Sequence, residues 1–296
     1  MQNDTRNQLF VLLQYLLPQH LISRWVGILA ASELPLIKDF LIQRFIHRYT
    51  VDLSEAAHQN SRDFASFNDF FTRALREDAR TWPAQASIMG CPADGCISQI
   101  GQIESGRIFQ AKGQYFDLLE LLGGDDRTAH PFMGGNFATI YLSPRDYHRV
   151  HMPCRGQLVR MIHVPGDLFS VNAATAQHVP RLFARNERVI CLFDTDHGPI
   201  AMVLVGAMIV ASIATPWAGL VTPVERKIRV TDYGQHQPPP LLERGDEMGR
   251  FLLGSTVILL TGPQQARWSS DLMAGSPVRM GSALGTWSEA ATPSAS

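Results

Sequence analysis

The character of the chain changes near residue 88, and this change limits the folds that it can adopt. Beyond that point short β-rich runs recur, bounded by glycine and proline, at 138–142, 189–193, 200–205, 208–213 and 257–260. Few long helical patterns interrupt them, which is typical of an antiparallel sheet rather than of alternating strands and helices. The sequence therefore predicts a mainly antiparallel β domain over residues 83–262.

The first eighty residues have a helical pattern instead. Apolar residues recur at i, i+3, i+4, i+7 and i+8 from Leu9 to Leu17, and Pro18 ends this run. A later phenylalanine-rich stretch, 64–75, predicts a core helix. The expected fold class is α+β: an N-terminal helical region (1–82), the mainly antiparallel β catalytic domain, and a loosely ordered tail (263–296) rich in small residues.

Composition excludes several kinds of partner and location. The 26 basic and 27 acidic residues create no general field for nucleic acid, so none is expected as a partner. The four cysteines form no Cys-x-x-Cys pair, which favours reduced thiols in a cytosolic setting. The N-terminus lacks the basic region of a secretion signal, and the longest apolar run, 25–31, is too short to span a bilayer.

The N-terminal helices have two interpretations. Residues 1–50 contain five basic side chains against three acidic ones, with Tyr15 and Trp25 nearby. Basic amphipathic helices with aromatic residues can lie on an anionic membrane surface. The pattern alone favours the other interpretation, in which the same apolar stripes pack against one another or against the β domain, because this is the usual fate of such faces.

The tripeptide Gly254-Ser255-Thr256 could carry unusual chemistry. Glycine has no side chain, so the carbonyl before Ser255 is unhindered, and the serine hydroxyl could attack its own backbone there. Gly-Ser-Thr also suits an ordinary turn.

Two further segments contain candidate catalytic side chains. Pro92-Ala93-Asp94-Gly95 places a carboxylate in a turn-like sequence, where it could instead only bond its own backbone. The segment 143–153 contains His148 and His151 beside Arg, Asp and Tyr, a density of titratable groups that proton transfer near neutral pH requires. It could also be a surface loop with incidental histidines.

A metal site is the alternative use of these histidines. His148, His151 and Cys154 are three residues apart, and imidazole and thiolate suit zinc. However, Pro144 and Pro153 disfavour a helix that would align them, and a strand would place the two histidines on opposite faces. Because no fourth ligand follows at a recognisable spacing, we expect no metal.

The order Asp94, His151, Ser255 resembles a hydrolase triad, in which aspartate orients histidine and histidine deprotonates serine. The chain lacks the Gly-x-Ser-x-Gly elbow of the α/β-hydrolases and their alternating strands and helices. A triad used for something other than ordinary hydrolysis stays open.

Six stretches then occur in a recognisable order. They are 67–73, 92–95, 141–151, 165–172, 183–188 and 248–256. Together they resemble the phosphatidylserine decarboxylase family, most closely its bacterial form with a short C-terminal part. The resemblance runs from about residue 60 to 262 and continues more loosely through the N-terminal helices. The tail beyond Pro263 and the 238–240 proline loop match poorly.

The resemblance implies a proenzyme that makes its own cofactor. Cleavage between Gly254 and Ser255 would give a large β chain, 1–254, and a small α chain, 255–296. In the family mechanism His151, oriented by Asp94, is the base that lets Ser255 attack the Gly254 carbonyl. Elimination and hydrolysis then convert Ser255 into an N-terminal pyruvoyl group (covalently bound pyruvate).

The resemblance also implies the reaction and its setting. The pyruvoyl group would form a Schiff base with phosphatidylserine and release carbon dioxide, giving phosphatidylethanolamine in phospholipid biosynthesis. His148 is expected to position the substrate, and His148 or His151 to return the proton. A peripheral enzyme on the cytoplasmic side of the cell membrane follows, with the N-terminal helices embedded at its surface and the paired chains dimerised further.

Two alternative functions, from other classes of protein, remain. A lipid-directed serine hydrolase would keep one uncut chain and form an acyl-enzyme on Ser255. A non-catalytic lipid-binding protein would use the polar segments only structurally.

Overall fold

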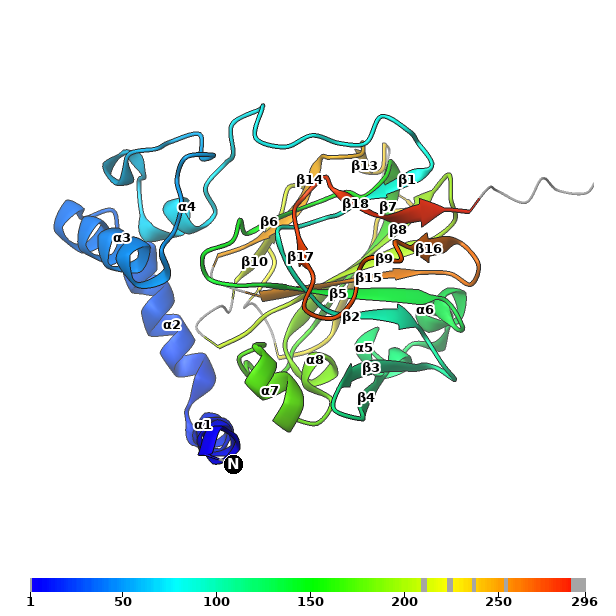
Figure 1. Cartoon of the computed structure of the whole chain (residues 1–296), viewed down its shortest axis with the longest axis horizontal. Coiled ribbons are helices and arrows are strands. Elements are labelled where there is room, and N and C mark those ends of the chain that lie inside the picture. The colour runs from blue at the N-terminus through cyan, green and yellow to red at the C-terminus, as the bar shows by residue number, and fades with distance from the viewer. Residues whose placement is uncertain (1, 209–211, 223–225, 236–237, 253–254, 289–296) are drawn as a thin grey trace, which may run out of the picture.

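A computed structural model describes residues 2–208, 212–222, 226–235, 238–252 and 255–288 of the 296-residue chain. It has short N-terminal helices followed by a mainly antiparallel sheet domain, which confirms the predicted α+β class. Figure 1 shows the first helices as an arm beside the sheet domain.

The arm consists of three helices: α1 (Gln2–Leu16), α2 (Gln19–Ala30) and α3 (Pro35–Tyr49). Pro18 separates the first two, as predicted, because proline has no N–H with which to continue a helix. α3 starts at a proline, which suits the first helical turn, and ends where Thr50 adopts a left-handed conformation with a φ of 53°. No helix of the described residues is both long and apolar enough to cross a membrane.

The predicted phenylalanine-rich helix is shorter than expected. After the 3-10 turn η1 (Ser61–Asp63), α4 spans only Phe67–Phe71, with the Ser66 side chain capping its N-terminus. Its phenylalanines are buried with α3 in an aromatic cluster, so the prediction of a core element holds. The helix stops at Thr72 because the following chain turns away and Leu75 forms a bridge with Ala56.

The remaining helices are short: α5 (Leu118–Leu121), α6 (Asp126–Ala129), η2 (His130–Phe132), α7 (Ala173–His178) and α8 (Leu182–Arg185). The strands are β1 (Ile88–Gly90), β2 (Gly95–Gln102), β3 (Arg107–Ala111), β4 (Gln114–Asp117), β5 (Asn136–Leu142), β6 (Arg149–His151), β7 (Gly156–Val164), β8 (Arg188–Thr195), β9 (Ile200–Val205), β10 (Ile213–Thr215), β11 (Gly219–Leu220), β12 (Arg229–Asp232), β13 (Leu241–Leu242), β14 (Glu247–Phe251), β15 (Ser255–Thr261), β16 (Ala266–Trp268), β17 (Pro277–Val278) and β18 (Ala283–Trp287).

One large antiparallel sheet organises the domain. Its strand order is β12-β7-β8-β9-β15-β5-β2-β17, and β13 pairs with β7. Two smaller sheets, β11-β10-β14-β6 and β1-β18-β16, accompany it, and β3 pairs with β4. The predicted strands at 138–142, 189–193, 200–205 and 257–260 all lie in the large sheet. Residues 209–211 of the predicted 208–213 strand lie outside the described residues.

The central strands are apolar throughout because both faces of the sheet are covered. Alternate residues of β9 and β15 point into different cores. One core lies between the large sheet and the two smaller sheets. The other lies between the opposite face and helices α5 to α8, with β3 and β4. Continuous apolar runs therefore mark strands that are buried on both sides.

The prediction of a loosely ordered tail is wrong for residues 263–288. Residues 263–288 instead form β16, β17 and β18, and the glycines and serines of this segment make the turns between them. β18 pairs with both β1 and β16, and β17 adds to the edge of the large sheet beside β2. Tertiary pairing, rather than local propensity, orders these short strands. Residues 289–296 lie outside the described part.

Candidate active site

The predicted cleavage bond falls at the start of a central strand. Ser255 is the first residue of β15, which is hydrogen-bonded to β5 on one side and β9 on the other. Gly254 lies outside the described residues, so the structure tests no geometry of the bond itself.

The chain on both sides of this bond is held against the segment with the two histidines. On the N-terminal side, the Phe251 N–H donates to the His148 carbonyl at 3.0 Å. On the C-terminal side, Ser255 pairs with Leu142 in the β15–β5 register. Because one residue spans at most about 3.6 Å, Ser255 lies within about 14 Å of Phe251. Phe251 and Ser255 are therefore both paired with residues at the ends of the loop that joins Leu142 to His148.

His148 is a fully buried, neutral imidazole. Its Nδ1–H donates to the Asp146 carbonyl at 2.7 Å, and its ring lies 4.0 Å from the Phe71 ring, centroid to centroid. Burial lowers the pKa of His148 to about 3. Among the described residues Nε2 has no hydrogen-bond partner, so it carries a free lone pair in a dry environment.

His151 is also mostly buried, and both ring nitrogens have partners. Nδ1–H donates to the Gly245 carbonyl at 2.8 Å, and the Tyr147 hydroxyl donates to Nε2 at 3.0 Å. Burial lowers the pKa of His151, and the bond to Gly245 opposes this effect. Burial also raises the pKa of Tyr147, so its hydroxyl stays protonated and able to donate. The His151 imidazole is therefore neutral near pH 7.

Asp94 lies near His151 but is bound to other groups. The His151 N–H donates to the Pro92 carbonyl at 2.8 Å, which places β6 beside the turn that contains Asp94. The Asp94 carboxylate accepts hydrogen bonds from the Arg80 guanidinium and from the Met280 N–H. Within the described residues Asp94 and His151 share no hydrogen bond; Asp94 influences His151 only through its charge, which raises the pKa of His151. The predicted pairing of these two side chains stays a prediction.

Helix α4 supports the histidine segment from the N-terminal region. The Phe71 ring covers His148, the Arg149 Nε–H donates to the Thr72 carbonyl at 2.8 Å, and Arg73 Nη2 donates to the Arg145 carbonyl at 3.0 Å. Phe71, Thr72 and Arg73 at the end of α4 thus hold the segment 145–149, which contains His148.

A polar cavity of about 290 Å³ opens beside these groups. Its lining includes Asp94, Tyr147 and the buried Arg73, whose Nη1 has no hydrogen-bond partner among the described residues. A larger cavity of about 1050 Å³, lined by His197 and Gln265 among others, contains none of the predicted site residues. Of the predicted site residues in the described part of the chain, Asp94 alone lines the smaller cavity.

Several site residues were not predicted from the sequence. Tyr147 lies four positions before His151 in the same segment, so its contact with that ring could have been anticipated. Phe71 belongs to one of the stretches that carry the family resemblance. Arg80 had no comparable signal, because it lies in the irregular segment between α4 and β1 and reaches Asp94 only through the tertiary fold.

The donor groups near the two histidines are not arranged as a set of metal ligands in the described residues. In the part of the chain that the structure describes, no group of three His, Cys, Asp or Glu side chains could hold a metal ion. The Nδ1 atoms of His148 and His151 both donate to carbonyls, and burial raises the pKa of Cys154 to about 12, which keeps its thiol protonated.

Comparisons with known proteins identify the family of this chain. A family model described as phosphatidylserine decarboxylase matches residues 67–286, and another, described as PSD, matches residues 9–50. The phosphatidylserine decarboxylase proenzyme of Bordetella petrii is 60% identical over 280 residues, and that of Pseudomonas aeruginosa is 58% identical over 280 residues. Each alignment covers 94% of this chain and 97% of the relative.

Both relatives are decarboxylases made as proenzymes. Because the first family model matches well over half of the chain, this chain belongs to the phosphatidylserine decarboxylase family.

Proposed function

We propose that this chain decarboxylates phosphatidylserine to phosphatidylethanolamine, using a pyruvoyl group that it makes by cutting itself between Gly254 and Ser255. The main support is the pairing of both flanks of this bond, Phe251 and Ser255, with both ends of the His148 loop. Purified protein mixed with phosphatidylserine vesicles should release carbon dioxide and form phosphatidylethanolamine. Release of fatty acid with no carbon dioxide would favour the lipid hydrolase instead.

Maturation requires a base and a serine held at its own backbone carbonyl. His151 takes the proton of the Ser255 hydroxyl, whose oxygen attacks the Gly254 carbonyl carbon. The peptide C–N bond then breaks as His151 gives this proton to the leaving nitrogen, which leaves an ester and a free amine. Loss of the Ser255 Cα proton and cleavage of the ester Cβ–O bond release the Gly254 carboxylate and leave dehydroalanine. Its imine form takes up water and loses ammonia. A positioned base contributes about 10²–10⁴-fold to such a step.

Tyr147 controls access to this base. Its hydroxyl occupies His151 Nε2 in the structure. The Ser255 hydroxyl therefore reaches His151 only after this hydrogen bond opens, or through the tyrosine oxygen. Asp94 supports the reaction by its negative charge, which favours the imidazolium that forms as His151 takes the proton.

The dependence of the self-cleavage rate on pH, on its acid side, tests whether His151 is the base. Burial lowers the pKa of its imidazole below the ordinary value of 6.5, so the neutral, basic form persists to lower pH. The rate constant should stay level from about pH 8 to 6.5 and fall only below that, as His151 becomes protonated. Processing of freshly translated proenzyme can be followed on gels after transfer to buffers of stepped pH. A rate that already halves above pH 6.5 would contradict this role.

The mature reaction needs a cofactor carbonyl and a dry, neutral pocket. A pyruvoyl group at residue 255 supplies a carbonyl that condenses with the substrate amine and withdraws electrons from the carbon that loses carbon dioxide. His148 offers a buried Nε2 lone pair, with its ring fixed by Phe71 and the Asp146 carbonyl, and so orients the headgroup. His148 or His151 returns the proton after carbon dioxide leaves.

The two product chains should stay together after cleavage. The small chain, 255–296, contributes β15 to the middle of the large sheet, between β5 and β9. The apolar side chains of β15 fill both cores. We expect a tightly associated pair of large and small chains, which dimerises further by analogy with the family.

The N-terminal arm supports binding to the cytoplasmic face of the cell membrane. Many of its large apolar side chains are exposed: Leu9, Leu12, Leu13, Leu16, Leu17, Leu21, Trp25, Ile28, Leu29, Leu34, Leu36 and Phe40. Polar side chains of α1 and α2 instead face the protein, since Gln14 accepts from the Ser170 N–H at 2.8 Å and Gln19 from the Leu168 N–H at 2.6 Å. An amphipathic helix that turns its apolar side outward suits a lipid interface.

Vesicle binding tests this orientation. Replacing Leu16, Trp25 and Leu36, which are 75%, 63% and 88% exposed, by glutamate should weaken flotation with anionic vesicles by about 10³-fold or more. Each such side chain contributes about 1.5–3 kcal/mol when buried, and glutamate adds repulsion. Met273→Glu, at a 65% exposed methionine of the β domain, is the matched control and should bind normally. Undiminished binding of the triple variant would exclude the arm as the membrane anchor.

A further inference from the structure

The Asp94 carboxylate is held by more groups than a surface aspartate would be. Oδ1 accepts from Arg80 Nε at 3.3 Å and from the Met280 N–H at 2.8 Å, and Oδ2 accepts from Arg80 Nη2 in a shorter contact. The side chains of Arg80 and Asp94 are only 7% and 15% exposed. Two nitrogens of one guanidinium on two oxygens of one carboxylate fix the plane of both groups.

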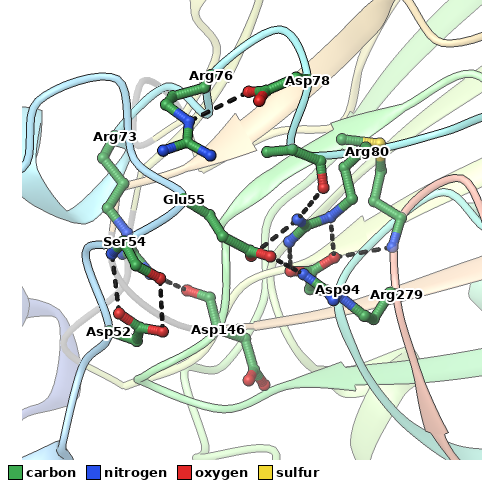
Figure 2. Close-up of polar contacts among 12 residues, drawn as sticks. Asp52, Ser54, Glu55, Arg73, Arg76, Asp78, Arg80, Asp94, Asp146 and Arg279 are labelled. Carbon is green, nitrogen blue, oxygen red and sulfur yellow. Dashed lines mark hydrogen bonds and ion pairs between the residues drawn. The ribbon is translucent and has the colours of Figure 1, made fainter.

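Arg80 is itself held in place by a second carboxylate. Its Nη1 donates to Glu55 Oε2 at 2.8 Å and to the Ala79 carbonyl at 2.7 Å. The other Glu55 oxygen accepts from Arg279 Nη2. These arginines, Arg279 first, lower the pKa of Glu55, which therefore stays ionised. Figure 2 shows the resulting chain of ion pairs, Arg279–Glu55–Arg80–Asp94.

The chain of ion pairs joins parts of the molecule that are far apart in sequence. Glu55 and Arg80 come from the N-terminal region, and Asp94 comes from the turn before β2. Arg279 and Met280 follow β17 in the segment that the proposed cleavage would assign to the small chain. Backbone bonds keep this segment in register with the Asp94 turn, since Cys91 donates to the Ser282 carbonyl at 2.7 Å.

We propose that Arg80 is a positioning residue for Asp94 and that the Arg279–Met280 segment of the small chain completes the Asp94 site. Glu55 anchors Arg80, and Arg279 anchors Glu55. This inference rests on the proposed role of Asp94 in self-cleavage. Without Arg80 the carboxylate retains only the Met280 N–H and can rotate, so its charge is no longer fixed relative to His151. Displacing a catalytic arrangement by about 1 Å can cost about 10²-fold in rate.

The alternative is that these ion pairs only stabilise the fold, and a double-mutant cycle separates the two roles. Self-cleavage would be timed in freshly translated Arg80→Gln, Asp94→Asn and the double variant. We expect Arg80→Gln to slow cleavage by about 10²-fold, and the double variant to cleave at the rate of Asp94→Asn alone, because Arg80 acts through Asp94. Further slowing in the double variant would show a separate, structural contribution and overturn the proposal.

Arg76→Gln is the matched control. Arg76 lies four residues away and pairs with Asp78 at 3.1 Å, but its side chain is 46% exposed and contacts no site residue in the described structure. It should cleave at the wild-type rate. Arg279→Gln should slow cleavage less than Arg80→Gln, because it acts through Glu55. Cleavage of Arg279→Gln at the wild-type rate would remove the Arg279 side chain from the proposal and leave the Met280 N–H as the contribution of the small chain.

Two outcomes distinguish this inference from the proposed function. If Asp94→Asn slows cleavage but Arg80→Gln does not, Arg80 is not a positioning residue and the proposed function stands. If Asp94→Asn cleaves at the wild-type rate, the proposed role of Asp94 fails, and this inference fails with it. Thermal unfolding of each variant in an uncleavable Ser255→Ala background would identify loss of the fold. If the self-cleavage rates of Arg80→Gln and Arg80→Lys fall in proportion to their melting temperatures, the result would contradict a positioning role for Arg80.

Discussion

Replacing Ser255 by alanine should leave a single chain of full length with no decarboxylase activity. Alanine has no hydroxyl to attack the Gly254 carbonyl and cannot become a pyruvoyl group. Loss of both the cleavage nucleophile and the cofactor should lower activity by at least about 10⁴-fold, the scale reached when a nucleophile is removed. Gel electrophoresis and a carbon dioxide release assay on the purified protein would measure both effects.

Ser270→Ala is the control for this experiment. Ser270 is an exposed serine of the same small chain, in the turn after β16. Its replacement should leave cleavage and activity unchanged. A Ser255→Ala chain that is still cut at residue 254, or that still decarboxylates, would rule out Ser255 as the source of the cofactor.

Replacing His148 by alanine should separate the two reactions. Cleavage should proceed, because His151 and Asp94 are the groups assigned to it. Decarboxylation should fall by about 10²–10⁴-fold, because the headgroup loses the buried Nε2 that orients it. The measurement is kcat and KM on phosphatidylserine vesicles, with both chains visible on the same gel to show that maturation is complete.

The imidazole of His178 offers a matched control. It also donates through Nδ1 to a backbone carbonyl, that of Ala174 at 2.7 Å, but it lies on α7. His178→Ala should mature and decarboxylate at the wild-type rate. A His148→Ala enzyme that matures normally and decarboxylates at the full rate would remove His148 from the mechanism.

The division of the chain into an N-terminal helical region and a β domain could be predicted, because each part follows a strong local rule. Pro18 ends α1, and the runs in β9 and β15 consist of residues that favour strands. Their central place in the sheet could not be predicted, since a run with no alternation does not show what covers each face. The strands of the tail were missed because β17 and β18 form only by pairing with β2 and β1.

The candidate site was predictable where its residues are close in sequence or belong to a motif. His148, His151 and Ser255 were proposed that way; the β14–β6 pairing holds the strand that contains His151, and the β15–β5 pairing holds the strand that begins at Ser255. The hydrogen-bond partners of Asp94 could not be predicted, because a long arginine side chain can reach a carboxylate from any neighbouring segment.

The orientation of the N-terminal arm also required the structure. Periodicity identifies an apolar stripe but does not show what the stripe contacts. A helix that packs on the protein and a helix that lies on a membrane therefore have the same sequence pattern. Here Gln14 and Gln19 bind backbone N–H groups of the β domain, while Leu16 and Trp25 are exposed. That arrangement is why we favour the membrane.

Intact-mass measurement of the purified wild-type protein tests self-cleavage with cofactor formation most directly. Two chains are expected, 1–254 and 255–296. The smaller should be lighter, by one ammonia, than a chain beginning with free serine, and it should lack a reactive N-terminal amine. A single uncut chain, with or without an acyl group on Ser255, would contradict the account, and so would a small chain that begins with unmodified serine.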